Sequence, residues 1–261
     1  MSPVDKELGS PESVGRMTRR AFAWGGASAI AGVAGWKWVT SRSVEGLVPW
    51  PLRRVLELDE KVGRSIFRSG HLAPTFAASR SKMPRVNGKA GIDLELNVDA
   101  WRLQVQGPKG AQSFNLAEVK ALPRFEMTTE LKCIEGWSTI VQWAGARLSD
   151  LAALTGLAAR DGKPGRIEPD SPDLLRFASL ATPDGKYYVG LDMPSAMHPQ
   201  SLLCYEMNGQ PLNKYHGAPL RLAIPVKYGI KNLKQIGTLR FTDTQPADYW
   251  AERGYDWYSG H

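Results

Sequence analysis

The sequence of 261 residues predicts an α+β fold, with one β-rich domain behind an N-terminal leader and a helix. Two observations support this class. Stretches in which apolar and polar residues alternate, as they do in half-buried strands, are mixed with short helical stretches. The order has no regular strand–helix–strand alternation and no internal repeat, so α+β is the class that fits best. We expect a leader at residues 1–42, a helix and linker at 43–75, and the main domain at 76–261.

The first forty residues have the pattern of an export signal. Arg19 and Arg20 are followed by Phe22 and by a weakly apolar run without charge until Lys37. A paired arginine before a mild apolar segment is the twin-arginine pattern, and the run is short and rich in Ala and Gly, as signal peptides are. We therefore expect export to the periplasm. A chance Arg-Arg pair before a small-residue helix is the alternative, and retention of the leader as a membrane anchor also stays open.

The next segments predict a helix, a loop and the first strands. Residues 49–67 have an apolar stripe of helical period, with Pro51 suited to the first turn. This helix can pack on the domain or rest on a membrane surface, and packing is favoured. After a loop at residues 69–91, apolar and polar residues alternate over 92–98 and again over 101–105, which predicts strands.

The remaining elements follow from turn and helix signals. "NLAEVKALP" predicts a short helix ended by Pro123, and "ARLSDLAALTG" predicts a helix closed by Gly156. Residues 174–193 predict a hairpin around the Pro-Asp-Gly turn at 183–185. Two further strands within residues 218–243 are joined by a basic loop.

Composition and charge exclude few classes of protein. Apolar residues make up 43% and charged residues 23% of the chain, as in ordinary soluble globular proteins. The formal net charge of +7 and the pI of about 9.4 favour anionic partners. Lys and Arg form no run of five, so nucleic acid is not expected as a partner. The two cysteines make neither a disulfide framework nor a zinc pattern.

One strand end singles out a cysteine. Phe125, Met127 and Leu131 share the parity of Cys133, which places the thiol on their face before a turn at Gly136. Three interpretations stay open from these residues: a small buried hydrophobe, a thiolate nucleophile, and a soft metal ligand. The strand end favours a site.

A nucleophilic cysteine would need a basic partner. His198 and His216 are the candidates, and the sequence does not place either beside Cys133. His198, next to a proline, is more typical of a structural hydrogen-bonding group. The second cysteine, Cys204, follows two leucines and is expected in the core.

Three segments resemble one family. They are "KCIEGWSTIVQWAGARLSDL", "LDMPSAMHPQSLLCYEMNGQPL" and "HGAPLRLAIPVKYGIKNLKQIGTL". In this order, between residues 124 and 240, they resemble the sulfite oxidase-type molybdopterin oxidoreductases. They are most similar to the branch of the exported bacterial methionine-sulfoxide reductase catalytic subunit. The resemblance implies that family's mixed, β-rich molybdopterin-binding fold and a molybdenum held by molybdopterin and by the Cys133 thiolate.

The resemblance also implies further site residues. Catalytic roles fall to Cys133, to Glu135 two residues on, and to Tyr258 as a pocket tyrosine. His216 stands where close relatives often have Asn. The implied cofactor contacts are Cys133, Ser179, His216, Arg221, Asn232, Leu233 and Lys234.

Without the resemblance, blander interpretations remain. Arg221 and Lys234 would be surface charges, and Tyr258 part of an aromatic clasp for the C-terminus. Earlier pterin contacts are expected near residues 75–80 without assignment.

The expected activity is oxygen-atom transfer. Sulfite-oxidising members typically have an Ala-Gly-Asn-Arg run after the cysteine, whereas this chain has "IEGWS" with a carboxylate at Glu135. We therefore expect a neutral small-molecule oxide, a sulfoxide or N-oxide, to be reduced. Sulfite oxidation is the alternative within the family. A cysteine hydrolase using Cys133 and a cofactor-free binding module are the alternatives outside it.

Electrons must then come from another protein. The chain has no Cys-x-x-Cys-His haem motif, and two cysteines are too few for a four-cysteine iron–sulfur cluster. A membrane haem subunit or a soluble cytochrome is the expected electron partner.

Overall fold

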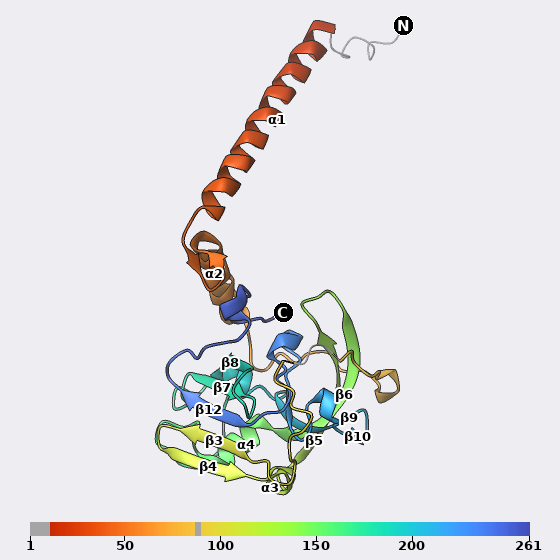
Figure 1. Cartoon of the computed structure of the whole chain (residues 1–261), viewed down its shortest axis with the longest axis vertical. Helices are drawn as coiled ribbons and strands as arrows, with labels where there is room; N and C mark the ends of the chain where they lie inside the picture. Colours follow the sequence, from red (N-terminus) through yellow and green to blue (C-terminus); the bar gives the residue numbers. More distant parts are fainter. Residues whose placement is uncertain (1–10, 87–89) are drawn as a thin grey trace. The chain divides into compact units, whose positions relative to one another are not determined.

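The computed structural model describes residues 11–86 and 90–261 (Figure 1). The chain separates into two units, Met1–Val55 and Leu56–His261. The boundary falls within one helix, so each unit is described by itself. Residues 1–10 of the expected leader lie outside the described residues.

The described part of the first unit, residues 11–55, consists of helix, one small hairpin and short turns. Its helix α1 (Pro11–Thr40) is followed by strands β1 (Val44–Glu45) and β2 (Val48–Pro49). Large apolar side chains of α1, among them Phe22 and Trp36, are exposed. Within the described residues, no helix has an apolar stretch long enough to cross a membrane.

Helix α2 (Trp50–Ile66) forms where the sequence predicts it, but its apolar stripe is only partly covered. In the second unit, the α2 side chains of Leu58, Val62 and Ile66 are exposed. The helix instead approaches the C-terminal tail at Gly63, where an added Cβ would lie 2.7 Å from the Tyr258 ring. Of the expected stripe, Phe67 packs against the main core as predicted, whereas the expectation is wrong for Val62 and Ile66.

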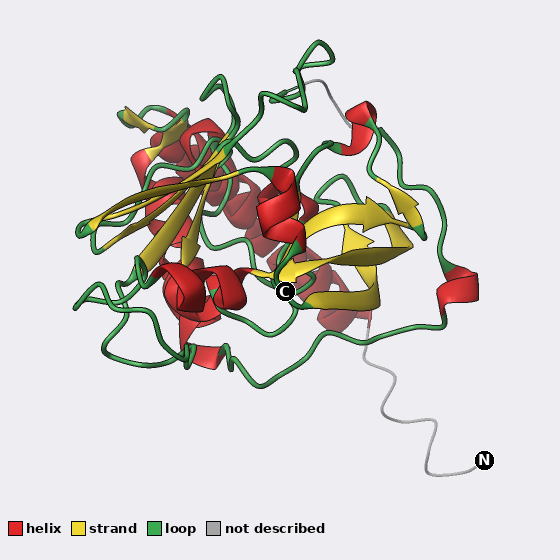
Figure 2. Ribbon diagram, turned by 90° about the horizontal axis from the view of Figure 1, so that it is seen from below, coloured by secondary structure: helices red, strands yellow, loops and turns green. Residues whose placement is uncertain are grey.

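Two five-stranded sheets form the second unit (Figure 2). In the first sheet the strand order is β10-β9-β6-β5, with β11 also paired to β9, and neighbours are antiparallel. In the second sheet the order is β4-β3-β12-β7-β8, and β12 pairs with β3 in parallel. The strands are β3 (Leu103–Gly107), β4 (Gly110–Phe114), β5 (Arg124–Lys132), β6 (Ser138–Arg147), β7 (Phe177–Ala181), β8 (Tyr188–Asp192), β9 (Leu202–Met207), β10 (Gln210–Pro211), β11 (Arg221–Ala223) and β12 (Thr238–Thr242).

Short helices connect these strands. In α3, Asn115 and Glu118 form a reciprocal capping box, and α4 ends at Gly156 as its sequence predicts. The helices are α3 (Leu116–Lys120), α4 (Leu148–Thr155) and α5 (Met193–Ala196), with 3₁₀ turns η2 (Ala78–Arg80), η3 (Lys214–His216), η4 (Gly229–Lys231) and η5 (Ala251–Arg253).

The structure confirms the α+β class. It also confirms the hairpin of β7 and β8 and the strand that leads to Cys133. The main hydrophobic core takes residues from both sheets, for example Leu103 and Leu180 from one and Leu203 and Ala146 from the other.

One expected strand is wrong. Residues 92–98 form turns, although their apolar and polar residues alternate. The Asp93 carboxylate accepts the Glu95 amide at 2.9 Å, and the Asn97 side chain accepts the amides of Asp99 and Ala100 at 3.0 and 3.2 Å. Such local side-chain bonds offer the backbone an alternative to a sheet ladder, which is why the alternation misleads here.

Candidate active site

Cys133 lies directly after β5, at the start of the turn to β6. Its amide donates to the Trp137 carbonyl at 2.9 Å, and its carbonyl accepts the Gly136 amide at 3.2 Å. Gly136 has a φ of +83°, a conformation that favours glycine and closes the turn. The turn therefore fixes a half-buried cysteine at the end of a strand.

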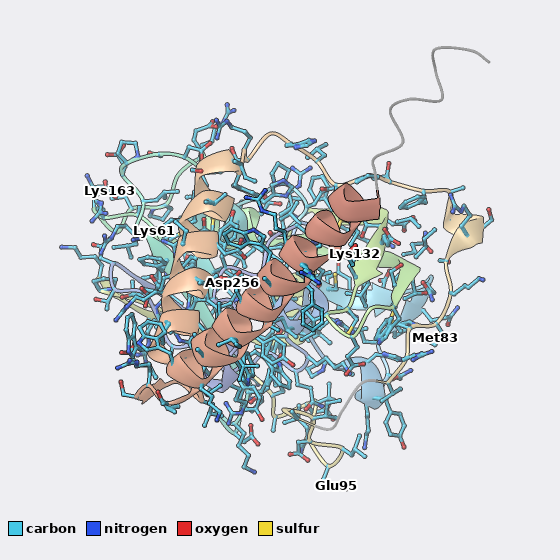
Figure 3. The ribbon with its side chains drawn as sticks, turned by 90° about the horizontal axis from the view of Figure 1, so that it is seen from above. Lys61, Met83, Glu95, Lys132, Lys163 and Asp256 are labelled. Carbon is cyan, nitrogen blue, oxygen red and sulfur yellow. The ribbon has the colours of Figure 1, made fainter. Side chains whose placement is uncertain are left out.

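A cavity of about 350 Å³ opens beside Cys133. Lys132, the last residue of β5, is labelled in Figure 3, as are Met83 and Glu95. Between these two in the sequence, the described residues Pro84, Arg85 and Ala90 line the cavity. The residues lining the cavity come from segments spread over the second unit: Pro84, Arg85, Ala90, Leu131, Cys133, Ile134, Glu135, Trp137, Tyr187, His216, Arg221, Gly229, Ile230, Asn232, Lys234, Tyr249, Trp250 and Tyr255.

The cavity has a cationic end built around Arg221. This side chain is 3% exposed, and its Nη1 donates to the His216 carbonyl at 3.0 Å while Nη2 lies 3.4 Å from the Asn232 carbonyl. The guanidinium thus joins the η3 and η4 segments. The two segments also touch at Gly217, which directly follows η3. A Cβ added to Gly217 would lie 2.9 Å from the Lys234 Cα, so only glycine leaves room for this approach.

The charges at this end are not balanced within the cavity lining. Burial, then Arg221 and Lys234, lowers the pKa of His216 to about 4. Burial, then Arg221, lowers the pKa of Lys234 to about 8, and burial lowers that of Arg221 to about 10. Of the described residues that line the cavity, Glu135 is the only acidic one. This end therefore favours an anion.

Two buried nitrogen atoms support the same conclusion. His216 Nδ1 and Arg221 Nε have no hydrogen-bond partner in the described part of the chain. Buried donors and acceptors are rarely left without a partner, so a ligand is expected here. A pterin that ends in a phosphate matches these groups in charge and hydrogen bonding.

Asn232 contributes differently. Its Oδ1 accepts the Ile224 amide at 2.9 Å, and its Nδ2 donates to the Tyr228 carbonyl at 3.2 Å. Because both ends of the amide are engaged with backbone, the side chain shapes the loop.

The cavity also has an aromatic wall, which we define as Tyr187, Tyr249, Trp250 and Tyr255. Tyr249 lies 4.9 Å from Tyr187 and 5.3 Å from Trp250 between ring centroids, and Trp250 lies 5.2 Å from Tyr255, edge to face. Tyr255 is 40% exposed, so the wall reaches the surface. Such a wall suits an apolar or sulfur-bearing group better than a second anion.

Glu135 is an exposed residue of the cavity lining. The carboxylate is exposed and accepts the Trp137 indole N–H at 3.1 Å. Both residues line the cavity.

The structure brings together six of the sequence-predicted site residues around one cavity: Cys133, Glu135, His216, Arg221, Asn232 and Lys234. Three others are not among the lining residues. Ser179 lies within β7, and Leu233 is fully buried in the main core. Tyr258 is 4% exposed and covers Lys227, whose Nζ lies 2.8 Å from the ring centroid.

The other histidine and the other cysteine are structural. His198 is buried, accepts the Gln200 amide on Nδ1 at 3.2 Å and lies 3.2 Å from the His71 carbonyl through Nε2. Cys204 is buried in a second core cluster, and burial raises its pKa to about 12. No disulfide links Cys204 to Cys133.

Sequence reasoning missed the aromatic wall and Arg85. The early contact was expected near residues 75–80, whereas Pro84, Arg85 and Ala90 reach the cavity. The tail "DYWAERGY" signalled aromatic residues near the site, and Tyr255 lies in the lining where Tyr258 was the candidate.

A half-buried cysteine that lines the same cavity as a buried arginine, a lysine and two buried nitrogen atoms without hydrogen-bond partners in the described residues defines a site for an anionic cofactor that carries a soft metal. The comparisons with known proteins identify that cofactor. Residues 89–250 match the family described as "Oxidoreductase molybdopterin binding domain". The chain therefore belongs to this family, the sulfite oxidase-type molybdopterin oxidoreductases, and is a molybdenum-dependent enzyme. The interpretations as a cysteine hydrolase and as a cofactor-free module are thereby excluded.

Two curated relatives agree with this assignment. The chain is 34% identical over 199 residues, 75% of its length and 70% of the relative's, to the "Putative protein-methionine-sulfoxide reductase subunit YedZ1" of Azospira oryzae. It is 35% identical over 176 residues to the protein-methionine-sulfoxide reductase catalytic subunit MsrP of Ralstonia nicotianae. That match covers 61% of this chain and 50% of MsrP, so the chain spans about half of the MsrP relative.

A solved structure is also similar, the sulfane dehydrogenase SoxCD from Paracoccus pantotrophus. Its TM-score is 0.48 at 21% identity, over 58% of this chain and 40% of that one. The family assignment rests on the matches described before it.

Proposed function

We propose that this molybdenum-dependent oxidoreductase reduces a sulfoxide, with methionine sulfoxide the first candidate. The observation that carries the proposal is the cavity itself, whose lining combines Cys133 with the cationic residues His216, Arg221 and Lys234 and with the aromatic wall. The names of the relatives, protein-methionine-sulfoxide reductases, support the substrate. A sulfoxide is neutral and bears apolar carbon on its sulfur, which suits the wall.

The residues would divide the work by the two ends of the cavity. Cys133 would hold the molybdenum, and His216, Arg221 and Lys234 would bind the anionic end of the pterin. Leu233 and Asn232 would contribute backbone groups of the loop. When bound, the molybdenum supplies two-electron oxygen-atom transfer.

The other residues would act on the substrate. The aromatic wall would pack on its apolar part and exclude water. Glu135, which is exposed, would exchange protons with solvent. The Tyr255 hydroxyl would donate a hydrogen bond to the oxygen of the substrate. Ser179 and Tyr258 would then act through packing.

Sulfite oxidation is the second candidate within the family. Glu135, the one acidic residue among the described lining residues, disfavours a dianion close to Cys133. We therefore rank the neutral sulfoxide first and an N-oxide next.

Export and electron supply belong to the same proposal. The Arg19-Arg20 pair before an apolar run supports twin-arginine export to the periplasm, with the leader cleaved or kept as an N-terminal membrane anchor. A membrane haem subunit or a soluble cytochrome would deliver the electrons.

The test is molybdenum content followed by turnover. In a host that makes the cofactor, the wild type should carry about one molybdenum per chain, and Cys133→Ala at least about tenfold less. Cys204→Ala is the matched control, since Cys204 lies in the core, and should load like the wild type. The loaded enzyme should then oxidise a reduced viologen dye with methionine sulfoxide.

Two results would remove the proposal. A wild type without molybdenum, in a host that loads other molybdoenzymes, would contradict the cofactor site. Sulfite oxidation without sulfoxide reduction would reverse the assigned substrate.

A further inference from the structure

The hydroxyl group of Tyr187 joins the two parts of the cavity. It accepts the indole N–H of Trp250 at 2.8 Å and donates to the carbonyl of Ile230 at 2.7 Å. A phenol has a single proton, and here it is committed to a backbone carbonyl. Burial raises the pKa of Tyr187, which keeps that proton in place. Tyr187 is thus suited to hold structure rather than to protonate a substrate.

A buried ion pair joins the same two segments a second time. Lys231, next to Ile230, places its Nζ 2.6 Å from an oxygen of Asp248 and 2.9 Å from the Gly190 carbonyl. The other oxygen of Asp248 accepts the amides of Trp250 and Ala251, each at 3.1 Å. Both charged side chains are buried. Asp248 therefore links the backbone of the aromatic wall, at Trp250, to the η4 turn that carries Lys231.

The turn that carries Lys231 leads directly into the cofactor end. The Asn232 amide donates to the Gly229 carbonyl at 3.0 Å, which closes η4, and Lys234 follows two residues later. A displacement of Ile230 or Lys231 would therefore move Asn232 and Lys234 with it.

We propose that Tyr187, Lys231 and Asp248 are positioning residues that couple cofactor retention to the fit of the substrate. The aromatic wall and the η4 loop are held by the same hydrogen bonds and ion pair, so a shift of one should shift the other. A change at the substrate should then affect cofactor binding, and a change at the cofactor should affect substrate binding to the same extent. The substrate half of this inference rests on the proposed function, whereas the cofactor half rests only on the family's cofactor.

The test compares two adjacent tyrosines. Tyr187→Phe removes only the bridging hydroxyl. Tyr188→Phe is the matched control, because the Tyr188 hydroxyl bonds to Glu252 at an exposed position. For each variant, KM and kcat are measured with methionine sulfoxide, and molybdenum release is followed during incubation at elevated temperature.

We expect Tyr187→Phe to raise KM by up to about tenfold, as loss of one hydrogen bond does, with a smaller change in kcat. It should also release molybdenum several-fold faster than the wild type. Tyr188→Phe should change neither quantity.

Other outcomes overturn the proposal. Equal KM and release rates in the two variants would show that the bridge positions nothing. A fall in kcat alone, with unchanged molybdenum release, would make Tyr187 a proton donor. If the wild type reduces no sulfoxide, the proposed function fails and the substrate half of the inference fails with it, whereas molybdenum release still decides whether Tyr187 supports cofactor retention.

Asp248→Asn provides a second variant. It keeps the side-chain size and the oxygen that accepts the Trp250 and Ala251 amides. It replaces the oxygen that faces Lys231, and that also accepts the Gly190 amide at 3.1 Å, with an NH₂ group. Folded protein, checked by circular dichroism, should again release molybdenum faster than the wild type. Release at the wild-type rate would remove the ion pair from the network.

Discussion

Two buried cations differ in what balances their charge. Lys231 is fully buried, and its ammonium lies 2.6 Å from the buried carboxylate of Asp248. Arg221 is 3% exposed, and among the described residues no carboxylate forms an ion pair with it. Its guanidinium instead contacts two backbone carbonyls and lies 4.6 Å from the Trp143 ring centroid. The protein completes the first site by itself and leaves the second to be completed by a ligand.

This difference indicates where the cofactor contributes to stability. A buried charge without a partner is unfavourable, so a protein keeps one where a ligand of opposite charge binds. Arg221 and Lys234 lie at the same end of the cavity, and each disfavours the charge of the other until an anion arrives. The comparison yields three predictions, given from the largest expected effect to the smallest.

Removing the Arg221 charge should have the largest effect on cofactor retention. Arg221→Met should weaken retention by roughly a hundredfold, because it removes a charge-assisted contact to the anion and the tie between His216 and Asn232. The measurement is molybdenum content after dialysis. Arg240→Met, an exposed arginine on β12 bonded to Gln106, is the control and should retain the metal.

Alkaline pH should release the cofactor through Lys234. Burial, then Arg221, lowers the pKa of Lys234 from 10.5 to about 8, so without an anion the side chain loses its proton above about pH 8. An anion prefers the protonated form, so affinity should fall as pH rises beyond about 8, by up to about tenfold per pH unit.

The stability of the cofactor-free protein should change with pH in the opposite direction to the cofactor affinity. Because the folded pKa lies below the ordinary value, protonation favours unfolding, and stability should rise between about pH 8 and 10.5. Lys234→Met should reduce the slope of both profiles, measured by molybdenum release and by urea unfolding. Buried Lys227, whose pKa burial lowers to about 7, adds a slope of the same sign to the unfolding profile, and that slope should remain in the variant. Unchanged profiles in that variant would assign the pH dependence elsewhere.

The smallest effect concerns the two tail tyrosines. Tyr255→Phe should lower kcat/KM for methionine sulfoxide by up to about tenfold, because it removes one hydroxyl from the wall. Tyr258→Phe should leave kcat/KM within about twofold, since its ring lies outside the cavity and covers Lys227. The reverse order of effects would restore Tyr258 as the pocket tyrosine.

Local signals in the sequence predicted much of the fold. The alternation before Cys133, the Gly136 turn and the β7–β8 hairpin depend on neighbouring residues, and the structure has each of them. The capping residues of α3 and α4 are likewise local. The alternation at residues 92–98 failed because side-chain bonds to nearby amides outweighed it.

The cavity walls were beyond such signals. Tyr187, Arg85 and Trp250 meet only through tertiary packing of segments far apart in the chain. The tail shows the limit most clearly, because Tyr255 and Tyr258 are three residues apart and yet only Tyr255 lines the cavity. The cationic residues were found through family motifs, and the missing carboxylate beside Arg221 is visible only in three dimensions.

The central claim is that Arg221 is completed by an anionic cofactor and Lys231 by the protein. The most direct measurement is urea unfolding of cofactor-free protein, made in a host that lacks the cofactor, for Arg221→Met and Lys231→Met. Lys231→Met should lower the free energy of unfolding by about 3–5 kcal/mol, because it leaves Asp248 buried and unpaired. Arg221→Met should change it by no more than about 1 kcal/mol. A loss in Arg221→Met as large as that in Lys231→Met would contradict the account.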